Sequence, residues 1–260
     1  MPFADSRGVR IHYELEGDGP ALALMHGFSG NRTSWRGYGF VDALKGDYQL
    51  ILIDARGHGE SDKPHAPEAY DHRRLVDDMI AVLDDGGWPT THYLGYSMGG
   101  MTGFGLARYY PDRLRSLIAG GVSPFNRDDP NARDELLEIY EVGVAQGVEA
   151  FVTRMRAWAG AITPAYEARL RSADLHAGVA QLRWRQAHRP DYAGDLATMA
   201  LPVLLYAGEA DEPTSSEARE AAAQLPNARF VVLPGLNHVG AAGARRLIVP
   251  QIKQFLATTP

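Results

Sequence analysis

The chain has 260 residues, a formal net charge of −6 at pH 7 and no cysteine. The lack of cysteine excludes disulfides, thiol catalysis and cysteine-ligated metals, and the negative charge gives no electrostatic reason to expect nucleic acid as a partner. Hydrophobic residues at 45% and charged residues at 22% are ordinary values for one large globular domain, or for a core with one insertion. The first residues lack the pattern of a signal peptide, and no apolar run is long enough to span a bilayer. We therefore expect a cytoplasmic protein without a membrane partner.

Short apolar segments that alternate with helical patterns predict a mostly parallel α/β sheet. Residues 9–15 alternate between apolar and polar side chains, whereas residues 21–25 and 50–53 are continuously apolar, as in strands that are buried on both faces. Apolar residues then recur at helical spacing in residues 75–83. We predict further strands at residues 90–94, 114–119, 202–207 and 229–233, and a helix over residues 99–107.

Residues 124–195 interrupt this alternation and carry helical patterns instead. Asp129-Pro130 predicts the start of a helix and Gly147 its end, and Thr163-Pro164 predicts another start. We predict a small helical cap over residues 124–195, inserted after the sixth strand of a core that comprises residues 1–123 and 196–260. Three apolar stripes at helical spacing support this interpretation: Leu136, Leu137, Tyr140 and Val144; Val148, Phe151, Val152 and Met155; and Leu175, Val179 and Leu182.

The pentapeptide Gly95-Tyr96-Ser97-Met98-Gly99 carries the strongest functional signal in the chain. A Gly-x-Ser-x-Gly sequence between a strand and a helix can form a strained turn that exposes the serine hydroxyl above the sheet. Gly95 and Gly99 lack the Cβ atoms that would collide in so tight a turn, and we expect Ser97 to adopt a positive φ. A surface serine in a glycine-rich turn is the plain alternative. The motif makes Ser97 the candidate nucleophile.

A serine hydroxyl is a weak nucleophile and needs a base, which is itself oriented by a carboxylate. Asp211 and His238 lie in the loops after the last two predicted strands. Because the carboxyl ends of parallel strands share one edge of a sheet, both side chains can meet Ser97 there. Glu209 is the competing acid. Asp211 could also cap the next helix, but the segment 214–217, Thr-Ser-Ser-Glu, fits a capping box that leaves the aspartate free.

Two backbone N–H groups are expected to stabilise negative charge on a reacting carbonyl oxygen. One belongs to Met98, directly after the candidate nucleophile, and the other to Phe28, in the glycine-containing loop after the strand at residues 21–25. Preorganised amides of this kind contribute roughly 2.7–4 kcal/mol each to acyl transfer. We expect His26 and His58 to make structural hydrogen bonds, His26 by holding the loop of Phe28 in shape.

Five segments, in this order, resemble the marker segments of the α/β-hydrolase superfamily: residues 26–28, 54–62, 95–100, 208–211 and 237–238. The resemblance covers nearly the whole chain except the cap. It implies the α/β-hydrolase fold, an eight-stranded mostly parallel sheet flanked by helices under a variable cap, with a triad in the order serine, acid, histidine. The segment 99–103 is also similar to that of 3-oxoadipate enol-lactonases and related small esterases, which implies a serine esterase or lactonase.

The predicted cap contains the most basic run of the chain, residues 183–189, and two tryptophans. Arg183 or Arg185 could bind a substrate carboxylate bidentately, and Trp158 and Trp184 could line the pocket. A solvated helix face and packing within the cap are the plain alternatives. The remaining histidines lack metal-ligand spacing, so we predict no metal and no cofactor: His12, His65, His72, His92, His176 and His188.

We interpret the chain as a serine hydrolase that cleaves a small carboxylic ester or lactone through an acyl-enzyme, with homo-oligomerisation left open. A cap of this size leaves little room for a long acyl chain. Carbon–carbon bond hydrolases and triad-based lyases such as menaquinone-pathway synthases use the same scaffold, and the motifs do not separate them. Haloalkane dehalogenases and epoxide hydrolases are disfavoured, because their nucleophile is an aspartate where this chain has Ser97. A non-catalytic ligand-binding receptor is the alternative from another class.

Overall fold

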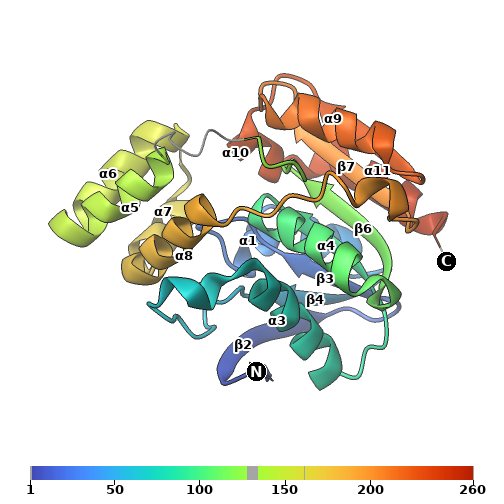
Figure 1. Cartoon of the computed structure of the whole chain (residues 1–260), viewed down its shortest axis with the longest axis horizontal. Coiled ribbons are helices and arrows are strands. Elements are labelled where there is room, and N and C mark those ends of the chain that lie inside the picture. Colours follow the sequence, from blue (N-terminus) through green and yellow to red (C-terminus); the bar gives the residue numbers. More distant parts are fainter. Residues whose placement is uncertain (1, 128–133, 161, 260) are drawn as a thin grey trace.

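One twisted sheet forms the centre of the molecule in the computed structural model, which describes residues 2–127, 134–160 and 162–259 (Figure 1). Within these residues the strands lie in the order β1-β2-β4-β3-β5-β6-β7-β8. The pairs β1–β2 and β2–β4 are antiparallel, and every other pair is parallel. The strands are β1 (Phe3–Ser6), β2 (Val9–Glu16), β3 (Ala21–Met25), β4 (Gln49–Ile53), β5 (Thr91–Tyr96), β6 (Leu114–Gly120), β7 (Val203–Gly208) and β8 (Ala228–Leu233).

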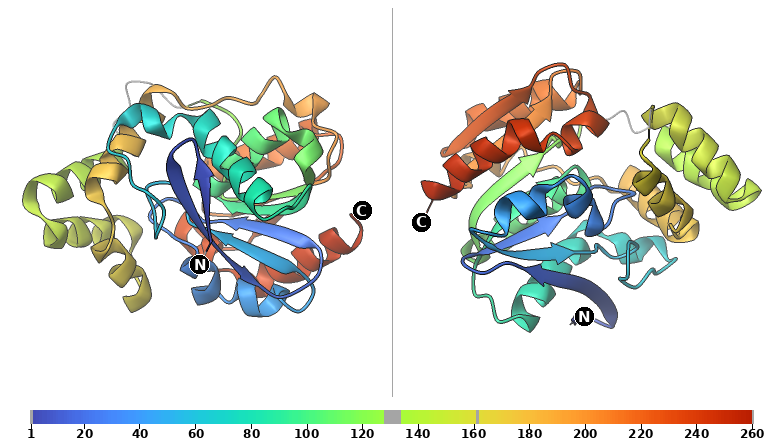
Figure 2. Two further views of the ribbon diagram at one scale, coloured as in Figure 1. Left: turned by 90° about the horizontal axis from the view of Figure 1, so that it is seen from below. Right: turned by 180° about the vertical axis from the view of Figure 1, so that it is seen from behind.

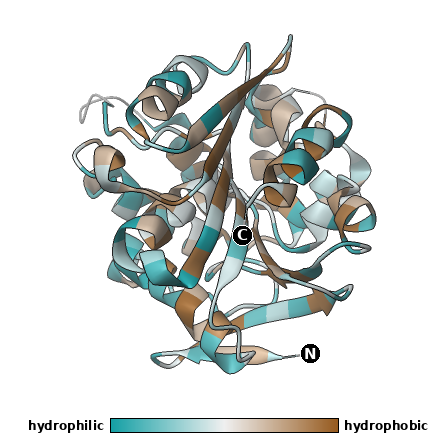
Figure 3. Ribbon diagram, turned by 90° about the vertical axis from the view of Figure 1, so that its right-hand side faces the viewer, coloured by the Kyte–Doolittle hydropathy of each residue, from teal (hydrophilic) through white to brown (hydrophobic). Residues whose placement is uncertain are grey.

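Helices cover both faces of the sheet (Figures 2 and 3). Apolar side chains of the strands pack against them in two clusters. Because side chains alternate along a strand, Ala23 and Met25 of β3 join one apolar cluster and Leu22 and Leu24 join the other. The first cluster includes residues of α3 (His72–Asp85), α4 (Met98–Tyr109) and α9 (Thr214–Gln224), and the second includes residues of α1 (Thr33–Gly37), α2 (Phe40–Leu44), α10 (His238–Ala242) and α11 (Arg245–Ala257). Short 3₁₀ helices lie at Pro67–Tyr70, Pro111–Arg113 and Leu196–Thr198.

The eight-stranded, mostly parallel sheet confirms the predicted fold class, and each strand predicted individually is present within two residues at either end. The first strand was not predicted from its own residues. It pairs with β2 through a tight turn in which Arg7 and Gly8 both have positive φ, 55° and 85°. Two consecutive positive φ angles characterise the hairpin turn whose twist matches that of the flanking strands.

Four α-helices lie between β6 and β7 in the described residues: α5 (Glu135–Gln146), α6 (Val148–Ala159), α7 (Pro164–Arg171) and α8 (Leu175–Ala187). Gly147, with a φ of 91°, ends α5, and Thr163 caps α7 by accepting a hydrogen bond from the N–H of Tyr166, as predicted. The predicted helix start at Asp129-Pro130 lies outside the described residues. Val144 was wrongly assigned to the buried stripe, because its side chain is 39% exposed and Ile139 is buried in α5 instead.

The segments that enter and leave this helical region run close together. The N–H of Tyr192 donates a hydrogen bond to the carbonyl oxygen of Pro124, and the side chain of Asn126 donates one to the carbonyl oxygen of Arg189. Tyr192 itself packs in the apolar cluster of the core. The cap boundaries at residues 124 and 195 stay a prediction that these contacts support. Among the described residues, no helix has both the length and the apolar character needed to cross a membrane.

The close packing of α4 on β3 generates a stability prediction. A Cβ atom on Gly99 would lie 2.2 Å from the backbone oxygen of Met25, so the helix would have to move away from the strand. We expect Gly99→Ala to lower the free energy of unfolding by at least about 2 kcal/mol in urea denaturation. Gly37→Ala is the matched control, because a Cβ there meets nothing within 4 Å. Equal stability of the two variants would contradict this account of the packing.

The burial of His92 generates a prediction about pH. Its side chain is 3% exposed and its Nδ1 lies 2.8 Å from the hydroxyl of Ser116, and burial lowers its pKa to about 4. The unfolded chain therefore takes up a proton near pH 6.5 that the folded chain does not, and folding stability falls as the pH drops from 6.5 towards 4. Between pH 7 and pH 5, the wild type should lose about 2 kcal/mol more unfolding free energy than His92→Asn.

Denaturant titrations at both pH values measure this difference, and His176→Asn is the control because His176 is exposed. The account is wrong if His92→Asn keeps the pH dependence of the wild type.

Candidate active site

Ser97 stands in the turn between β5 and α4 and has the positive φ expected of it, 52°, with a ψ of −110°. The turn is tight: a Cβ on Gly95 would lie 2.3 Å from the backbone oxygen of Gly99. The N–H of Ser97 donates a hydrogen bond to the carbonyl oxygen of Gly120 at 2.7 Å, which fixes the turn to β6. A non-glycine residue in this conformation costs about 1–3 kcal/mol and persists where the surroundings impose it.

Asp211, His238 and Ser97 form one line of hydrogen bonds across the ends of β7, β8 and β5. The Nδ1 of His238 lies 2.8 Å from Oδ2 of Asp211, and its Nε2 lies 3.1 Å from Oγ of Ser97. When Nδ1 carries the proton and donates it to the carboxylate, Nε2 of the neutral ring accepts the hydrogen bond of the serine hydroxyl. Asp211 is buried, whereas the side chain of His238 is 37% exposed. The line of hydrogen bonds therefore runs from the protein interior to a side chain that solvent can reach.

Glu209, the competing acid, makes a different contact. Its Oε2 accepts a hydrogen bond from the N–H of Gly235 at 2.9 Å and so supports the loop that leads to His238. The capping box predicted at residues 214–217 does not form. Thr214 is already the first residue of α9, and the hydroxyl of Ser216 bonds to the carboxylate of Glu212, 2.6 Å away. The carboxylate of Asp211 is nevertheless free for the histidine, because the N–H of Ser215 in the first turn of α9 donates to the backbone carbonyl of Asp211 and not to its side chain.

Tyr96 adds a contact between the nucleophile turn and the histidine loop that the sequence did not indicate. Its side chain is buried, and its hydroxyl donates a hydrogen bond to the backbone carbonyl of His238 at 2.5 Å. Burial raises the pKa of Tyr96 well above its ordinary value, so the phenol stays a hydrogen-bond donor. The variable position before the serine therefore helps to hold the histidine backbone.

The two predicted oxyanion donors belong to segments that adjoin Ser97. Met98 is the first residue of α4, so its N–H has no partner within the helix and lies at the positive end of the helix dipole. Phe28 follows Gly27, where a Cβ would approach the Cβ of Ser97 to 3.5 Å. The next residue, Ser29, has a positive φ of 60°. The loop of Phe28 is therefore strained and lies against the serine.

Buried side chains fix this loop from behind. His26 accepts a hydrogen bond from the N–H of Ala55 at Nε2 and donates one from Nδ1 to the carbonyl oxygen of Gly27, at 3.1 and 2.8 Å. Burial lowers the pKa of His26, which favours this neutral form. The carboxylate of Asp54 accepts hydrogen bonds from the backbone N–H and from the guanidinium of Arg32, at 2.8 and 2.6 Å. These contacts agree with the structural role expected for His26.

His58 also makes the structural contact expected of it, with Nδ1 3.1 Å from the carbonyl oxygen of Arg56. Burial lowers the pKa of His58 to about 3, so the ring is neutral at ordinary pH. Its ring lies edge-on to that of Phe28, with centroids 5.3 Å apart, and Phe28 packs in turn on Tyr140 of α5. The core and the cap helices therefore hold Phe28 from both sides.

The two cap arginines predicted to reach the substrate are paired with carboxylates of the cap instead. Arg183 pairs with Glu141 at 2.7 Å and Arg185 pairs with Asp134 at 2.5 Å, and both guanidinium groups are substantially exposed. Their role in binding a carboxylate is therefore corrected: carboxylates of α5 and of its N-cap already neutralise them. The sequence could not show this, because the partners lie 42 and 51 residues away along the chain.

The two tryptophans predicted to line the pocket lie in other environments. Trp158 is 39% exposed on α6. Trp184 packs against a small cluster around Tyr70 and stacks on His188, with ring centroids 3.9 Å apart. A cap residue that the sequence did not single out, Gln181 of α8, contacts the candidate site: it is buried and donates a hydrogen bond to the sulfur of Met98 at 3.0 Å.

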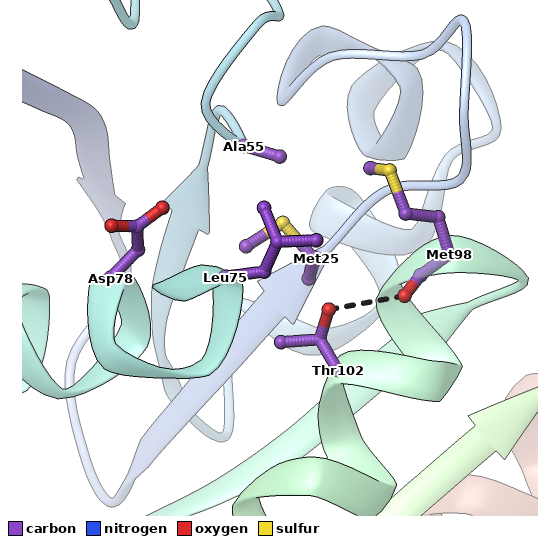
Figure 4. Close-up of a pocket in the computed structure, with 6 residues that line it drawn as sticks. All are labelled: Met25, Ala55, Leu75, Asp78, Met98 and Thr102. Carbon is purple, nitrogen blue, oxygen red and sulfur yellow. Dashed lines mark hydrogen bonds between the residues drawn. The ribbon is translucent and has the colours of Figure 1, made fainter. Parts of the chain in front are cut away.

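A small cavity lies below Met98 (Figure 4). Its volume is about 10 Å³, roughly the space that one water molecule occupies. Thr102 lines it and donates a hydrogen bond to the carbonyl oxygen of Met98, 3.1 Å away. The other lining residues are Met25, Ala55, Leu75 and Asp78. A typical ligand pocket is at least about 300 Å³, so this cavity does not extend the site into a long tunnel.

Comparisons with known proteins agree with this fold. Residues 20–241 match the family described as alpha/beta hydrolase fold. A Bacillus subtilis (strain 168) protein with the provisional name 2-succinyl-6-hydroxy-2,4-cyclohexadiene-1-carboxylate synthase is 28% identical over 97% of this chain and 97% of its own. A malate-bound thermophilic esterase from Thermogutta terrifontis has a TM-score of 0.79 and 25% identity, covering 98% of this chain and 97% of that one.

The enol-lactonase from Burkholderia xenovorans LB400 shares the fold, with a TM-score of 0.80 and 22% identity over 98% of this chain and 100% of that one. The family match extends from the strand before the loop of Phe28 to the helix that begins at His238. With the sheet order described above, it shows that the chain belongs to the α/β-hydrolase family of enzymes.

Proposed function

We propose that this protein is a serine hydrolase that cleaves a small carboxylic ester or lactone through an acyl-enzyme. The observation that carries the proposal is the line Asp211–His238–Ser97, with distances of 2.8 and 3.1 Å that suit proton transfer. Glu209 bonds to a backbone N–H instead of the histidine, which favours Asp211 as the acid. A histidine oriented in this way is the base that a serine hydroxyl requires.

In the proposed reaction, Nε2 of His238 takes the proton of Ser97 while Oγ attacks the substrate carbonyl carbon. The N–H groups of Met98 and Phe28 would stabilise the negative charge on the carbonyl oxygen. The imidazolium then returns the proton to the leaving alcohol, or to the ring-opened end of a lactone, as the acyl-enzyme forms. Water, deprotonated by the same histidine, releases the acid and restores Ser97.

Elimination is the second candidate, favoured by the likeness to the Bacillus subtilis protein that is named as a synthase. In that reaction the Ser97–His238 pair would act as a base on carbon and no acyl-enzyme would form. The two candidates differ in the covalent intermediate, which rapid-mixing kinetics with a 4-nitrophenyl ester detects as a burst of one nitrophenolate per active site when deacylation is slow.

Substitution of the nucleophile tests the proposal directly. We expect Ser97→Ala to lower kcat/KM for 4-nitrophenyl acetate or butyrate by at least about 10³-fold with unchanged circular dichroism, because loss of a triad member removes most of the catalysis. More than a tenth of wild-type activity in this variant would end the assignment of Ser97 as nucleophile. The same ester series should show a preference for short acyl chains, and a preference for chains beyond about ten carbons would contradict the small-substrate proposal.

The identity of the acid is tested by a matched pair of amide substitutions. Asp211→Asn should lower kcat by roughly 10³- to 10⁴-fold, since an amide neither stabilises the imidazolium nor enforces the tautomer that leaves Nε2 free. Glu209→Gln should have a mild effect, because its contact is with the N–H of Gly235, which a side-chain amide oxygen can still accept. The reverse order of the two effects would make Glu209 the acid.

A further inference from the structure

Arg169 lies on α7, the cap helix that stands beside the segment carrying the loop of Phe28 (Figures 1 and 2). One turn earlier on the same helix, the hydroxyl of Tyr166 lies 2.9 Å from Oγ of Ser29. Ser29 directly follows Phe28, the residue proposed to supply one oxyanion donor. This hydrogen bond fixes the face of α7 that carries Tyr166 and Arg169 against the candidate active site.

The guanidinium of Arg169 has no carboxylate partner in the described part of the chain. Its central carbon lies 5.3 Å from the ring centre of Tyr166, and its Nε is buried without a hydrogen-bond partner. Two neighbouring arginines of α6 and α7 are paired: Arg156 with Glu167, and Arg171 with Glu149 and Glu167. A buried N–H donor without a partner costs about 1–3 kcal/mol, so a ligand that accepts from it would recover this loss.

The positive charge of Arg169 acts on groups that surround the loop of Phe28. Burial raises the pKa of Tyr38 and of Tyr166, and the charge of Arg169 opposes both shifts. Burial lowers the pKa of His26, and the same charge contributes to that lowering. Tyr38 packs against the apolar cluster that includes Tyr96, the residue before the nucleophile. Arg169 is therefore close to groups of the core on the side of the oxyanion loop.

We propose that Arg169 binds a carboxylate group of the substrate, so that the ester or lactone cleaved by this protein is an anion. The inference rests on the proposed function, because it concerns the substrate of that same site. The guanidinium can donate two parallel hydrogen bonds to a carboxylate. The hydroxyls of Tyr38 and Tyr166, on which the charge of Arg169 acts, are neutral hydrogen-bonding groups on the same side of the site. Arg183 and Arg185, which the sequence favoured for this role, are occupied by Glu141 and Asp134.

A ligand group with one negative charge, such as a carboxylate, matches the charge around Arg169 better than a doubly charged phosphate monoester. One guanidinium supplies one positive charge, and the neutral phenols add donors but no charge. The whole chain carries a net charge of −6, which disfavours a second negative charge on the ligand. We therefore assign a carboxylate carried by an otherwise small ester or lactone.

Paired substrates of equal shape test the proposal by turnover. Each pair has one acidic and one neutral member: 3-acetoxybenzoate with its methyl ester, and 4-nitrophenyl hydrogen adipate with its methyl ester. Arg169→Gln should lower the ratio of kcat/KM for the acidic member to that for the neutral member by roughly 10- to 100-fold in at least one pair. Arg183→Gln and Arg185→Gln remove the same charge from the outer face of the cap and should leave the ratio within about twofold.

Arg169→Lys keeps the charge without the planar pair of donors and should give an intermediate ratio. An unchanged ratio in both Arg169 variants, or an equal fall in Arg183→Gln, would overturn the proposal.

A binding measurement separates this inference from the proposed function. Calorimetric titration of 3-acetoxybenzoate into Ser97→Ala protein needs no turnover, and adding Arg169→Gln should raise Kd by at least roughly tenfold. If the wild type hydrolyses no ester but this difference in Kd is found, the hydrolase proposal fails and the carboxylate site stands. If esters are hydrolysed and Kd does not depend on residue 169, the carboxylate site is wrong.

Discussion

The close backbone contact where β5 turns into α4 is the constraint on which the rest of the site depends. A Cβ on Gly99 would lie 2.2 Å from the backbone oxygen of Met25, and one on Gly95 would collide with Gly99 itself. Only glycine at both positions lets the helix start directly above the strand. The turn then holds Ser97 at a positive φ and directs the N-terminus of α4 towards the serine, where its N–H groups can stabilise developing negative charge.

Three hydrogen bonds between residues far apart in the chain hold the loops around this turn, and one of them starts from the turn itself. Tyr96 bonds to the backbone of His238, Ala55 bonds to His26, and Gly235 bonds to Glu209. These contacts involve mostly backbone groups, so they set the path of each loop before any catalytic side chain is considered. The geometry of Ser97 and His238 follows from them. A site assembled in this way costs little reorganisation when charge develops during the reaction.

The sequence predicted those features that local chemistry determines. Continuous apolar runs mark strands buried on both faces, and the glycines around Ser97 mark a turn that needs them. The first strand was missed because four residues with alternating burial carry little signal, and the hairpin is formed by backbone angles at Arg7 and Gly8. The capping box was wrong because α9 starts at Thr214 itself, which removes the position that a capping side chain needs.

The cap shows the limit of such prediction most clearly. A basic run such as residues 183–189 indicates charge but not its partner. Two of its three arginines, Arg183 and Arg185, pair with carboxylates that the packing of α8 on α5 brings near. Arg169 carried no comparable sequence signal, because it is one of two arginines in the last turn of α7 and nothing local separates it from Arg171. Its significance comes from tertiary placement: a half-buried cation, one donor of which lacks a partner, near the loop that carries Phe28. Leaving this donor without a partner costs folding free energy that the contact with the ring of Tyr166 only partly offsets. Residues that break a local rule in this way concentrate at functional sites, where a ligand can complete the structure.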